Sequence, residues 1–513
     1  MKVLLREEWA VFWQKLLSLY LVLWLNGVFK ALYDRRLEKF FAPRSIAVVG
    51  ASREPGKVGY QILYNLKSGF RGEIYPVNPR AKSILGLKAY PSLLEIPGEI
   101  DLAVIAVPAA IVPRVLEDAG KKKIEAVIVI SAGFKEIGPR GALLEKKLVE
   151  VAKKYGIRVI GPNVVGVYVP RTGVNTTFLD TSRMDFPNSG PIAFLSQSGA
   201  FGIAVLDWAS MRGIGISKFV SLGNKADVDE ADLLYYLVED EETRVITMYI
   251  EGVEKGRKFF NALVETTTRK PVVVLKAGRS EEGARAIASH TGSLAGSDKI
   301  YDAVFKQTGT IRANGMEELF DIALALALQP PARGCRIGIL TAGGGSGVMA
   351  TDAARALGLE VPKLSSKTIE KLRRVLLPIA SPYNPVDVTG SMRDEHMLEA
   401  LEILLKSGEI DALIWIPYFM LPSVSKEFTK KFVERLKEVE KELETPIPVV
   451  GAATGGRYTW SQALEAEKQG IPMFISVERA AKAVWALFRY GLWLRRKGVF
   501  KDYIEKTRKT LGY

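Results

Sequence analysis

The sequence predicts an α/β protein made of three tandem domains, each built on a doubly wound parallel sheet. Two observations carry this prediction. Short apolar runs alternate with helical segments of ten or more residues, which is the pattern of β-α-β units. The alternation occurs in three successive series along 513 residues, and a chain of that length is expected to hold about three domains.

The first series is placed at residues 37–165. Its apolar runs SIAVVGAS, EIYPVN, DLAVIAVP, AVIVISAG and RVIGPN are expected as strands. Helices are expected from about Val58, over IVPRVLEDAGK and over GALLEKKLVEVAKKYG. Because the strands are joined by helices, they should form one parallel sheet.

The second series, placed at residues 166–329, follows a connection rich in Pro, Gly and Asn that runs through Asn188. Strands are expected at PIAFLSQSG, SKFVSLG, RVITMYIEG and PVVVLKAG, and a long helix at MEELFDIALALAL. The composition of QPPARG predicts a linker, because Pro330 and Pro331 cannot continue that helix. The third series, residues 333–513, has strands at RIGILTAGG, DALIWIPY and IPVVGAAT.

The composition excludes several classes of protein. Hydrophobic residues make up 48% and charged residues 25%, as in globular chains. The lone Cys335 excludes a disulfide framework and a cysteine-rich metal site, and no metal site is predicted, so a reducing cytoplasm is expected. The formal charge of +14 lies on basic residues interspersed with acids, which disfavours nucleic acid and favours a polyphosphate ligand or an acidic partner.

Residues 1–36 form an apolar N-terminal extension that lacks the strand and helix pattern of the rest of the chain. The unbroken apolar run Leu16 to Leu25 is shorter than the roughly 20 residues that span a bilayer. One interpretation is an amphipathic helix that binds a partner or a membrane surface, so membrane contact is disfavoured but stays open. The favoured interpretation is a misassigned start codon, with translation beginning near Val28 or Leu32.

A glycine-containing loop follows the first strand. Gly50, Gly56 and Gly59 would let phosphates approach backbone N–H groups at a helix N-terminus. The spacing is not G-x-G-x-x-G, and the second strand ends in Val77-Asn78-Pro79-Arg80 without the acidic residue that holds an NAD ribose. Arg80 suits the extra phosphate of NADP or of CoA. An ordinary tight turn with a solvated Arg80 is the alternative.

His290 is one of two histidines and lies in KAGRSEEGARAIASHTGSLAGSD. The glycines, serines and alanines of this segment predict a mobile loop. Neutral imidazole is nucleophilic and can take and release a phosphoryl group; without further context, a surface loop histidine is the alternative. The second histidine, His396, is predicted on a polar helix at the surface.

The run LSQSGAFG places Ser196, Ser198 and Gly199 where a strand ends and a helix begins, which indicates an anion site. A simple serine N-cap is the alternative. Glu251 ends the strand RVITMYIE at the edge where parallel sheets place their sites. Its carboxylate could hold one imidazole nitrogen while the other attacks phosphorus, or it could be a solvated residue.

These segments together resemble the ADP-forming acyl-CoA synthetases, relatives of succinyl-CoA synthetase, over about residues 37 to 490. The most specific element is SHTGSLAGSD, which resembles the phosphohistidine loop of the family. The other matches follow in the same order: RSIAVVGAS, IYPVNP, SAGF, GPN, LSQSGA, GNKADVDEADLL, YIEG, KAGRS and NPVDVTG.

The resemblance implies a Rossmann-like CoA-binding domain followed by two flavodoxin-like domains, and an alpha subunit that needs a separate ATP-grasp beta subunit in an α₂β₂ assembly. ADP or ATP with Mg²⁺ would bind mainly on that partner. His290 would carry the phosphoryl group, oriented by Glu251, and phosphate would bind at Ser196, Ser198, Gly199 and Asn224. The implied CoA residues are Gly50, Ala51, Ser52, Asn78, Pro79, Arg80, Val107, Pro108 and Ser131.

The sequence departs from the family at two places. Val164 follows GPN where the family usually has cysteine, so a thiol cannot be essential there. The run TAGGGSGVMATD differs from the common TNAGGPGV at Ala342, Gly343 and Ser346.

Two other functions are alternatives. One is a non-catalytic CoA-binding regulatory protein. The other is an NADP-dependent oxidoreductase, a function that would give His290 no role. The acyl group and the choice of ADP over GDP stay open.

Overall fold

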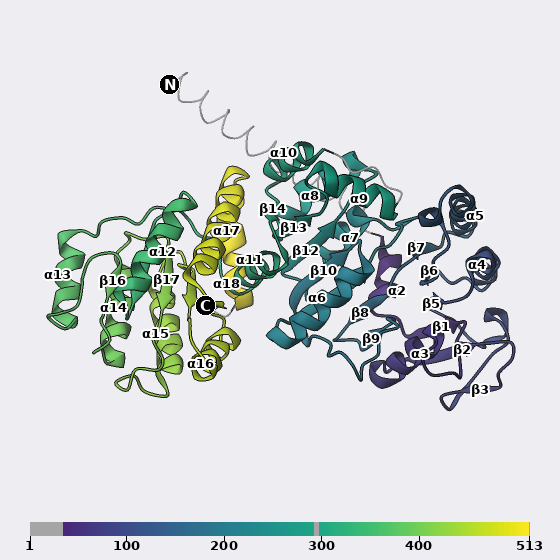
Figure 1. Ribbon diagram of the computed structural model, residues 1–513, viewed down its shortest axis with the longest axis horizontal. Helices are drawn as coiled ribbons and strands as arrows, with labels where there is room; N and C mark the ends of the chain where they lie inside the picture. The colour runs from purple at the N-terminus through teal and green to yellow at the C-terminus, as the bar shows by residue number, and fades with distance from the viewer. Residues whose placement is uncertain (1–33, 292–296, 512–513) are drawn as a thin grey trace, which may run out of the picture.

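The structure is a computed structural model that describes residues 34–291 and 297–511. It contains sheets of five, seven and five strands, one in each predicted series, and each has five parallel strands, so the prediction of tandem doubly wound α/β domains is confirmed. Figure 1 shows the three sheets side by side, with the first domain at the right and the third at the left. Of the predicted extension, residues 1–36, residues 1–33 lie outside the described residues.

The first sheet has the strand order β2-β1-β5-β6-β7. A short antiparallel pair, β3 and β4, follows β2 and was not anticipated. The elements are β1 Ser45–Val49, β2 Glu73–Val77, β3 Ser83–Ile84, β4 Leu87–Lys88, β5 Leu102–Ile105, β6 Ala126–Val129, β7 Arg158–Ile160, α2 Glu38–Phe41, α3 Val58–Gly69, α4 Val112–Lys121 and α5 Pro139–Tyr155.

The second sheet has the order β14-β13-β12-β10-β11-β8-β9. β8 pairs antiparallel with β11 and with β9, inside a segment predicted to be only a connection. The elements are β8 Val167–Val169, β9 Val174–Asn175, β10 Ser189–Ser196, β11 Ile216–Ser221, β12 Val245–Ile250, β13 Val272–Lys276, β14 Ile311–Ala313, α6 Gly199–Arg212, α7 Glu230–Leu237, α8 Gly256–Thr267, α9 Glu281–Thr291, α10 Asp298–Thr308 and α11 Met316–Leu328.

The third sheet has the order β16-β15-β17-β18-β19. Its elements are β15 Ile337–Thr341, β16 Val386–Asp387, β17 Ala412–Ile416, β18 Val449–Ala452, β19 Met473–Phe474, α12 Gly344–Ala356, α13 Ser366–Val375, α14 Asp394–Lys406, α15 Phe428–Glu442, α16 Arg457–Lys468, α17 Val477–Arg496 and α18 Phe500–Leu511. None of the helices within 34–291 and 297–511 is long and apolar enough to cross a bilayer.

All three sheets share one arrangement of their five parallel strands. When these five strands are numbered in chain order, the second strand pairs with one edge of the first. The third strand pairs with the other edge of the first, and the fourth and fifth follow beyond it. The direction of winding therefore reverses between the first and third strands, and ligands of such sheets bind at that point, beyond the carboxyl ends of the strands. In the first two sheets the reversal falls between β1 and β5 and between β10 and β12.

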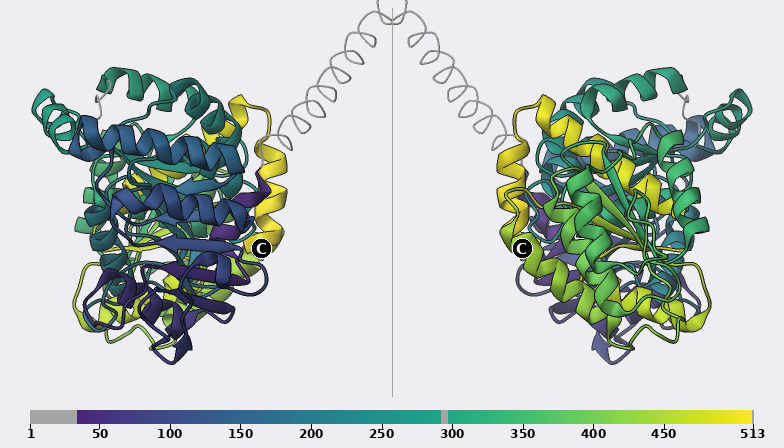
Figure 2. Two further views of the ribbon diagram at one scale, coloured as in Figure 1. Left: turned by 90° about the vertical axis from the view of Figure 1, so that its right-hand side faces the viewer. Right: turned by 90° about the vertical axis from the view of Figure 1, so that its left-hand side faces the viewer.

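The hydrophobic cores continue across the domain junctions. Ile46 and Ile128 of the first domain share one buried cluster with Leu234 of the second. Phe320 of α11 and Leu487 of α17 belong to a second cluster, which joins the second domain to the third. Figure 2 shows α17, in yellow, lying along the third domain, and this helix also packs on α11.

The predicted linker QPPARG is part of this packing. Pro330, Pro331 and Ala332 are buried. The Gln329 side chain accepts a hydrogen bond from the N–H of Val449 at 2.7 Å and donates one to the carbonyl of Gly470 at 2.6 Å. The composition predicted a break in the helix, which is present, but residues 329–332 are buried and do not form an exposed linker.

Residues 34–36, predicted as the end of the extension, belong to the fold. Asp34 forms an ion pair with Arg158, which also pairs with Asp227 at 2.8 Å and with Asp232 at 3.4 Å. Burial raises the pKa of Asp34, but hydrogen bonds from Arg36 and Arg158 outweigh it and lower the pKa to about 2. The Asp34 carboxylate therefore stays ionised and holds the start of the first domain to Arg158, which in turn pairs with the second domain.

Candidate active site

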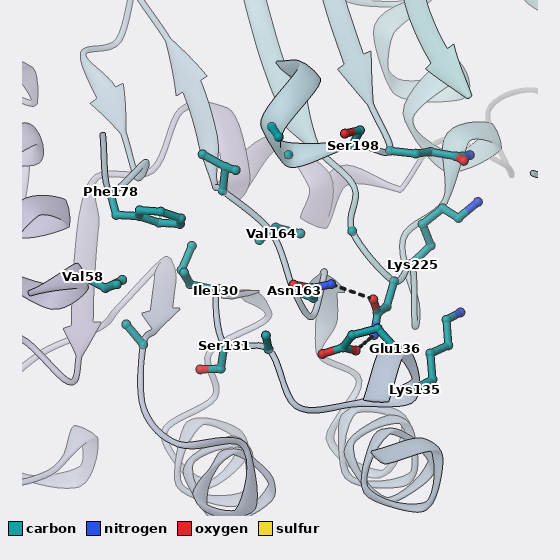
Figure 3. Close-up of a pocket in the computed structure, with 18 of the residues that line it drawn as sticks. Val58, Ile130, Ser131, Lys135, Glu136, Asn163, Val164, Phe178, Ser198 and Lys225 are labelled. Carbon is teal, nitrogen blue, oxygen red and sulfur yellow. Dashed lines mark hydrogen bonds between the residues drawn. The ribbon is translucent and has the colours of Figure 1, made fainter. Parts of the chain in front are cut away.

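A cavity of about 620 Å³ lies between the first and second domains, where both sheets present their carboxyl ends (Figure 3). Figure 3 shows Val58, Ile130 and Phe178 toward one end and Lys135 and Lys225 toward the other. The residues that line it are Val58, Ala106, Val107, Pro108, Ile130, Ser131, Ala132, Lys135, Glu136, Asn163, Val164, Val165, Phe178, Gln197, Ser198, Gly199, Ala200, Gly223, Asn224, Lys225 and Glu251.

The loop after β1 needs its glycines for close packing. Gly50 has a φ of +89°, and a Cβ there would lie 2.3 Å from the carbonyl oxygen of Ala106. A Cβ on Gly59 would lie 2.0 Å from the carbonyl oxygen of Gly50, so α3 can approach the loop only because residue 59 has no side chain. The loop and the helix N-terminus together present backbone groups at the edge of the first sheet.

The predicted CoA residues fall into two neighbouring groups. Gly50, Ala51, Ser52, Asn78, Pro79 and Arg80 gather at the ends of β1 and β2, where the Asn78 amide donates to the carbonyl of Ala51 at 2.8 Å. The Arg80 side chain is exposed. Val107, Pro108 and Ser131 line the cavity, and the Ser131 hydroxyl donates to the carbonyl of Val107 at 2.5 Å. The second group thus ties together the loops after β5 and β6.

The predicted phosphate loop joins β10 to α6. The Ser196 hydroxyl is buried and donates to the carbonyl of Ser198 at 2.7 Å. The Ser198 hydroxyl caps α6 by accepting from the N–H of Phe201 at 3.3 Å. Ser198 and Gly199 line the cavity, whereas Ser196 supports the loop from beneath. The positive end of α6 therefore faces the cavity, as an anion site requires.

Sequence reasoning missed Gln197, which connects this loop to the one after β12. Its Oε1 accepts from the N–H groups of Glu251 at 2.7 Å and Gly252 at 3.1 Å, and its Nε2 donates to the carbonyl of Gly252 at 2.8 Å. The Gln197 amide thus bridges the loops after β10 and β12, the two strands between which the winding of the second sheet reverses. An amide between two serines at a strand end was the available signal.

Glu251 follows β12 directly and lines the cavity next to the predicted phosphate loop. The strand register places Ser196 opposite Tyr249, two residues before Glu251. Burial raises the pKa of Tyr249 to about 12, and the charge of Glu251 and a hydrogen bond to it add to the effect. Tyr249 therefore remains a neutral hydroxyl beside the Glu251 carboxylate.

Asn224 has a different environment from the one expected of a phosphate ligand. Its Nδ2 donates to Oε2 of Glu136 at 2.6 Å and to Oε2 of Glu145 at 2.8 Å. Its Oδ1 accepts from Nδ2 of Asn163 at 3.3 Å. Both amide hydrogens are thus used by carboxylates of the first domain, and the residue bridges the two domains at the cavity wall.

The surroundings shift the pKa values of the Glu136 and Glu145 carboxyls in opposite directions. Burial raises the pKa of Glu136, but hydrogen bonds from Asn224 and from the N–H groups of Gly133 and Phe134 outweigh it, so the pKa lies below its usual value. Burial dominates at Glu145 and raises its pKa. Glu136 therefore acts as an ionised acceptor that orders the loop after β6.

His290 lies in the last turn of α9, and its side chain is outside the described part. The predicted mobile loop is thus helical over Glu281–Thr291, because two glutamates begin the segment and alanines, which favour helix, recur through it. Residues 292–296 lie outside the described residues. α9 contacts the 3₁₀ turn Lys135–Ile137, which carries Glu136.

Three other predicted features have clear positions. Val164 is 4% exposed and lines the cavity, so an apolar wall stands where the family usually has a thiol. At the altered loop of the third domain, Ser346 and Tyr418 share a hydrogen bond of 2.7 Å between their hydroxyls. His396 is half-buried in the first turn of α14, where its Nδ1 accepts from the N–H of Arg393 at 3.0 Å.

The residues described at 34–291 and 297–511 contain no group of three or more His, Cys, Asp or Glu side chains that could hold a metal ion.

Family models match all three domains. Residues 44–170 match a CoA binding domain, residues 189–326 match a succinyl-CoA ligase like flavodoxin domain, and residues 337–480 match a Ligase-CoA domain.

Curated relatives match most of the chain. The alpha subunit of ADP-forming acetate–CoA ligase II of Pyrococcus furiosus is 44% identical over 88% of this chain and 97% of its own length. The ADP-forming acetate–CoA ligase I of Archaeoglobus fulgidus is also 44% identical, over 91% of this chain. The chain spans 65% of that longer protein.

Solved structures are similar to this chain as well. A dinucleotide forming acetyl-coenzyme A synthetase 1 of Ca. Korarchaeum cryptofilum, in complex with phosphate and ADP, superposes with a TM-score of 0.81 at 40% identity, covering 92% of this chain and 98% of that one. The chain belongs to the ADP-forming acyl-CoA synthetases. Within that family, it corresponds in extent to the alpha subunit.

Proposed function

We propose that this chain catalyses acyl-CoA + phosphate + ADP = carboxylic acid + CoA + ATP together with a second subunit, through an acyl phosphate and a phosphohistidine at His290. One observation carries the proposal. A single cavity joins the loops of the CoA binding domain to the α6 N-terminus and to Glu251, so a thioester and a phosphate would have neighbouring sites there.

In the first half-reaction, CoA would bind at Gly50, Ala51, Ser52, Asn78, Pro79, Arg80, Val107, Pro108 and Ser131. Phosphate would be held at the α6 N-terminus by Ser198 and Gly199, with Ser196 supporting the loop. A phosphate oxygen attacks the thioester carbonyl, the C–S bond breaks, and CoA leaves as the thiolate. The bonds of Asn224 to Glu136 and Glu145 support a role in holding the domains together, not in contacting phosphate.

In the second step, an imidazole nitrogen of His290 would attack the phosphorus of the acyl phosphate. The P–O bond to the acyl group breaks, and the carboxylate leaves with the electron pair. Glu251 would accept the hydrogen bond from the other ring nitrogen, which favours the tautomer that can attack. The position of Glu251 beside the phosphate loop supports this role.

The phosphoryl group would then pass to ADP on a separate ATP-grasp beta subunit, where Mg²⁺ enters with the nucleotide. Two findings support the assignment of the ADP step to a separate subunit. The three α/β domains match family models of a CoA binding domain, a succinyl-CoA ligase like flavodoxin domain and a Ligase-CoA domain. The Pyrococcus relatives of matching length are named alpha subunits. The α₂β₂ stoichiometry is inferred from the resemblance to the family alone.

The test is to incubate the purified chain with acetyl-CoA and phosphate, with and without its ATP-grasp subunit, and to measure intact mass. An acid-labile adduct of about 80 Da is expected on the wild type and not on His290→Asn. If CoA binds but no adduct forms in either setting, the enzyme proposal fails and a CoA-binding regulatory protein is the better description.

A further inference from the structure

A buried lysine lies at the carboxyl edge of the second sheet, next to the candidate site. Lys276 is the last residue of β13 and is 1% exposed. It pairs in register with Ile250 of β12, the residue before Glu251. β12 in turn pairs with β10, whose end carries the phosphate loop. The Lys276 side chain is therefore a cation at the edge where the proposed phosphoryl chemistry takes place.

Few neighbouring groups compensate the positive charge of the Lys276 ammonium. Its Nζ donates to the carbonyl of Ala277 and lies 4.8 Å from the ring centroid of Tyr301. Over the described residues, Lys276 has no carboxylate within ion-pair distance, and Glu251 and Asp298 act on it only through longer-range attraction. By contrast, the buried Lys218 pairs with Asp240 at 2.8 Å and with Glu242 at 3.0 Å.

A buried charge without a counter-ion costs several kcal/mol of stability on general grounds. Burial accordingly lowers the pKa of Lys276. A methionine or leucine would fill the same space without that cost, so packing alone does not account for a lysine here. A cation that has no ion-pair partner among the described residues, at the sheet edge proposed to bind phosphate, is instead suited to an anion that is present for only part of the reaction.

We propose that Lys276 supplies the positive charge that stabilises the phosphoryl group while His290 carries it. The inference rests on the proposed function. When the imidazole nitrogen forms its bond to phosphorus and the acyl carboxylate leaves with the P–O electron pair, two negative charges remain on the phosphoryl oxygens. Lys276 compensates these charges electrostatically and neither gains nor loses a proton.

The position of α10 agrees with this role. Tyr301, whose ring lies against the Lys276 ammonium, is in the first turn of α10, and its hydroxyl accepts from the N–H of Val253 at 3.0 Å. His290 lies in the last turn of α9, the helix that precedes α10. Lys276 is thus enclosed by the loop after β12 and by the helix that follows the His290 segment.

The experiment compares Lys276→Met with Lys270→Met. Lys270 is also buried, but it precedes β13 at the opposite edge of the sheet and donates to the carbonyls of Leu237, at 2.7 Å, and Asp240. Each variant is assayed for its rate of phosphoenzyme formation from acetyl-CoA and phosphate, under the conditions that label the wild type. The midpoint of thermal unfolding is measured in parallel.

Lys276→Met should slow phosphoenzyme formation about 100-fold while its unfolding midpoint stays unchanged or rises by about 2–4 °C. Lys276→Arg should restore part of the rate. Lys270→Met should lower the midpoint and leave the rate within about twofold of the wild type. A wild-type rate in Lys276→Met, or a loss of rate that follows a loss of stability in both variants, would overturn the inference. If the wild type itself forms no adduct, the proposed function fails and the inference fails with it.

Discussion

Asn224 and Glu136 are joined by a 2.6 Å hydrogen bond that links the second domain to the first at the wall of the cavity. The bond aligns an amide donor with a carboxylate that also orders the loop after β6. The same amide donates to Glu145, so one neutral side chain serves two carboxylates.

Replacing that amide with a carboxylate should destabilise the junction. Asn224→Asp would remove both donors and place three carboxylates together, at a cost of about 2–3 kcal/mol of unfolding free energy near pH 8. Repulsion raises the pKa of these carboxyls in the folded state above their unfolded values, so the penalty should shrink as pH falls toward 5. Urea unfolding at the two pH values measures this, with the exposed Asn188→Asp as control. An equal penalty at both pH values would contradict the account.

Ser198 offers a way to separate capping from anion binding. Ser198→Asp keeps an N-cap acceptor for α6, so the unfolding free energy should change by less than about 0.5 kcal/mol. Its charge would repel phosphate, so phosphate-dependent acyl-CoA cleavage should fall about 100-fold. Ser476 caps α17 in the same way, and Ser476→Asp should leave the activity intact. Full activity in Ser198→Asp would show that the α6 N-terminus does not hold the phosphate.

Gly59 should be essential for the CoA loop. Alanine at this position would meet the carbonyl of Gly50 at 2.0 Å, so Gly59→Ala should cost about 2 kcal/mol of stability and weaken CoA binding at least about tenfold. Gly256 begins α8 with no atom within 4 Å of an added Cβ, and Gly256→Ala should be neutral or stabilising by up to about 1 kcal/mol. Calorimetric titration with CoA and thermal unfolding measure both effects.

Glu440 should make stability depend on pH. It is 2% exposed, neither of its carboxylate oxygens has a hydrogen-bond partner among the described residues, and burial raises its pKa to about 8. A folded pKa above the unfolded value means that the contribution of Glu440 to stability is full below pH 4.5 and is lost as pH rises through 8, by on the order of 5 kcal/mol in all and about 2–3 kcal/mol between pH 6 and pH 9. Glu440→Gln should remove most of that loss. Parallel urea profiles for the two proteins at pH 6 and pH 9 would contradict this prediction.

The sequence predicted the elements that have a strong local signal. α11 occupies Met316–Leu328, the run MEELFDIALALAL, because its apolar and helix-favouring residues leave little alternative. The strand-to-helix turn at Ser198 was also predictable, since serine before a helical run is a common N-cap. Strand order and the β8–β9 hairpin were not, because they depend on pairing between residues distant in the chain.

The candidate site was predictable in its residues but not in their contacts. Ser198, Glu251, Val107 and Ser131 line one cavity, as expected of residues at the carboxyl ends of parallel strands. The partners of Asn224 lie 79 and 88 residues away along the chain. No local pattern records such contacts, so only the family resemblance predicts a role for Asn224, and the role it predicts is that of a phosphate ligand.

The continuous cores have a consequence for how the chain comes apart. Because apolar side chains of α11 and α17 belong to one buried cluster, separating the second and third domains would bring to water surface that is now interior. We expect the three sheets to unfold in one cooperative transition. A fragment that ends near residue 330 would therefore present the face of α11 to solvent and tend to aggregate, so the architectural boundary is a poor place to cut the chain.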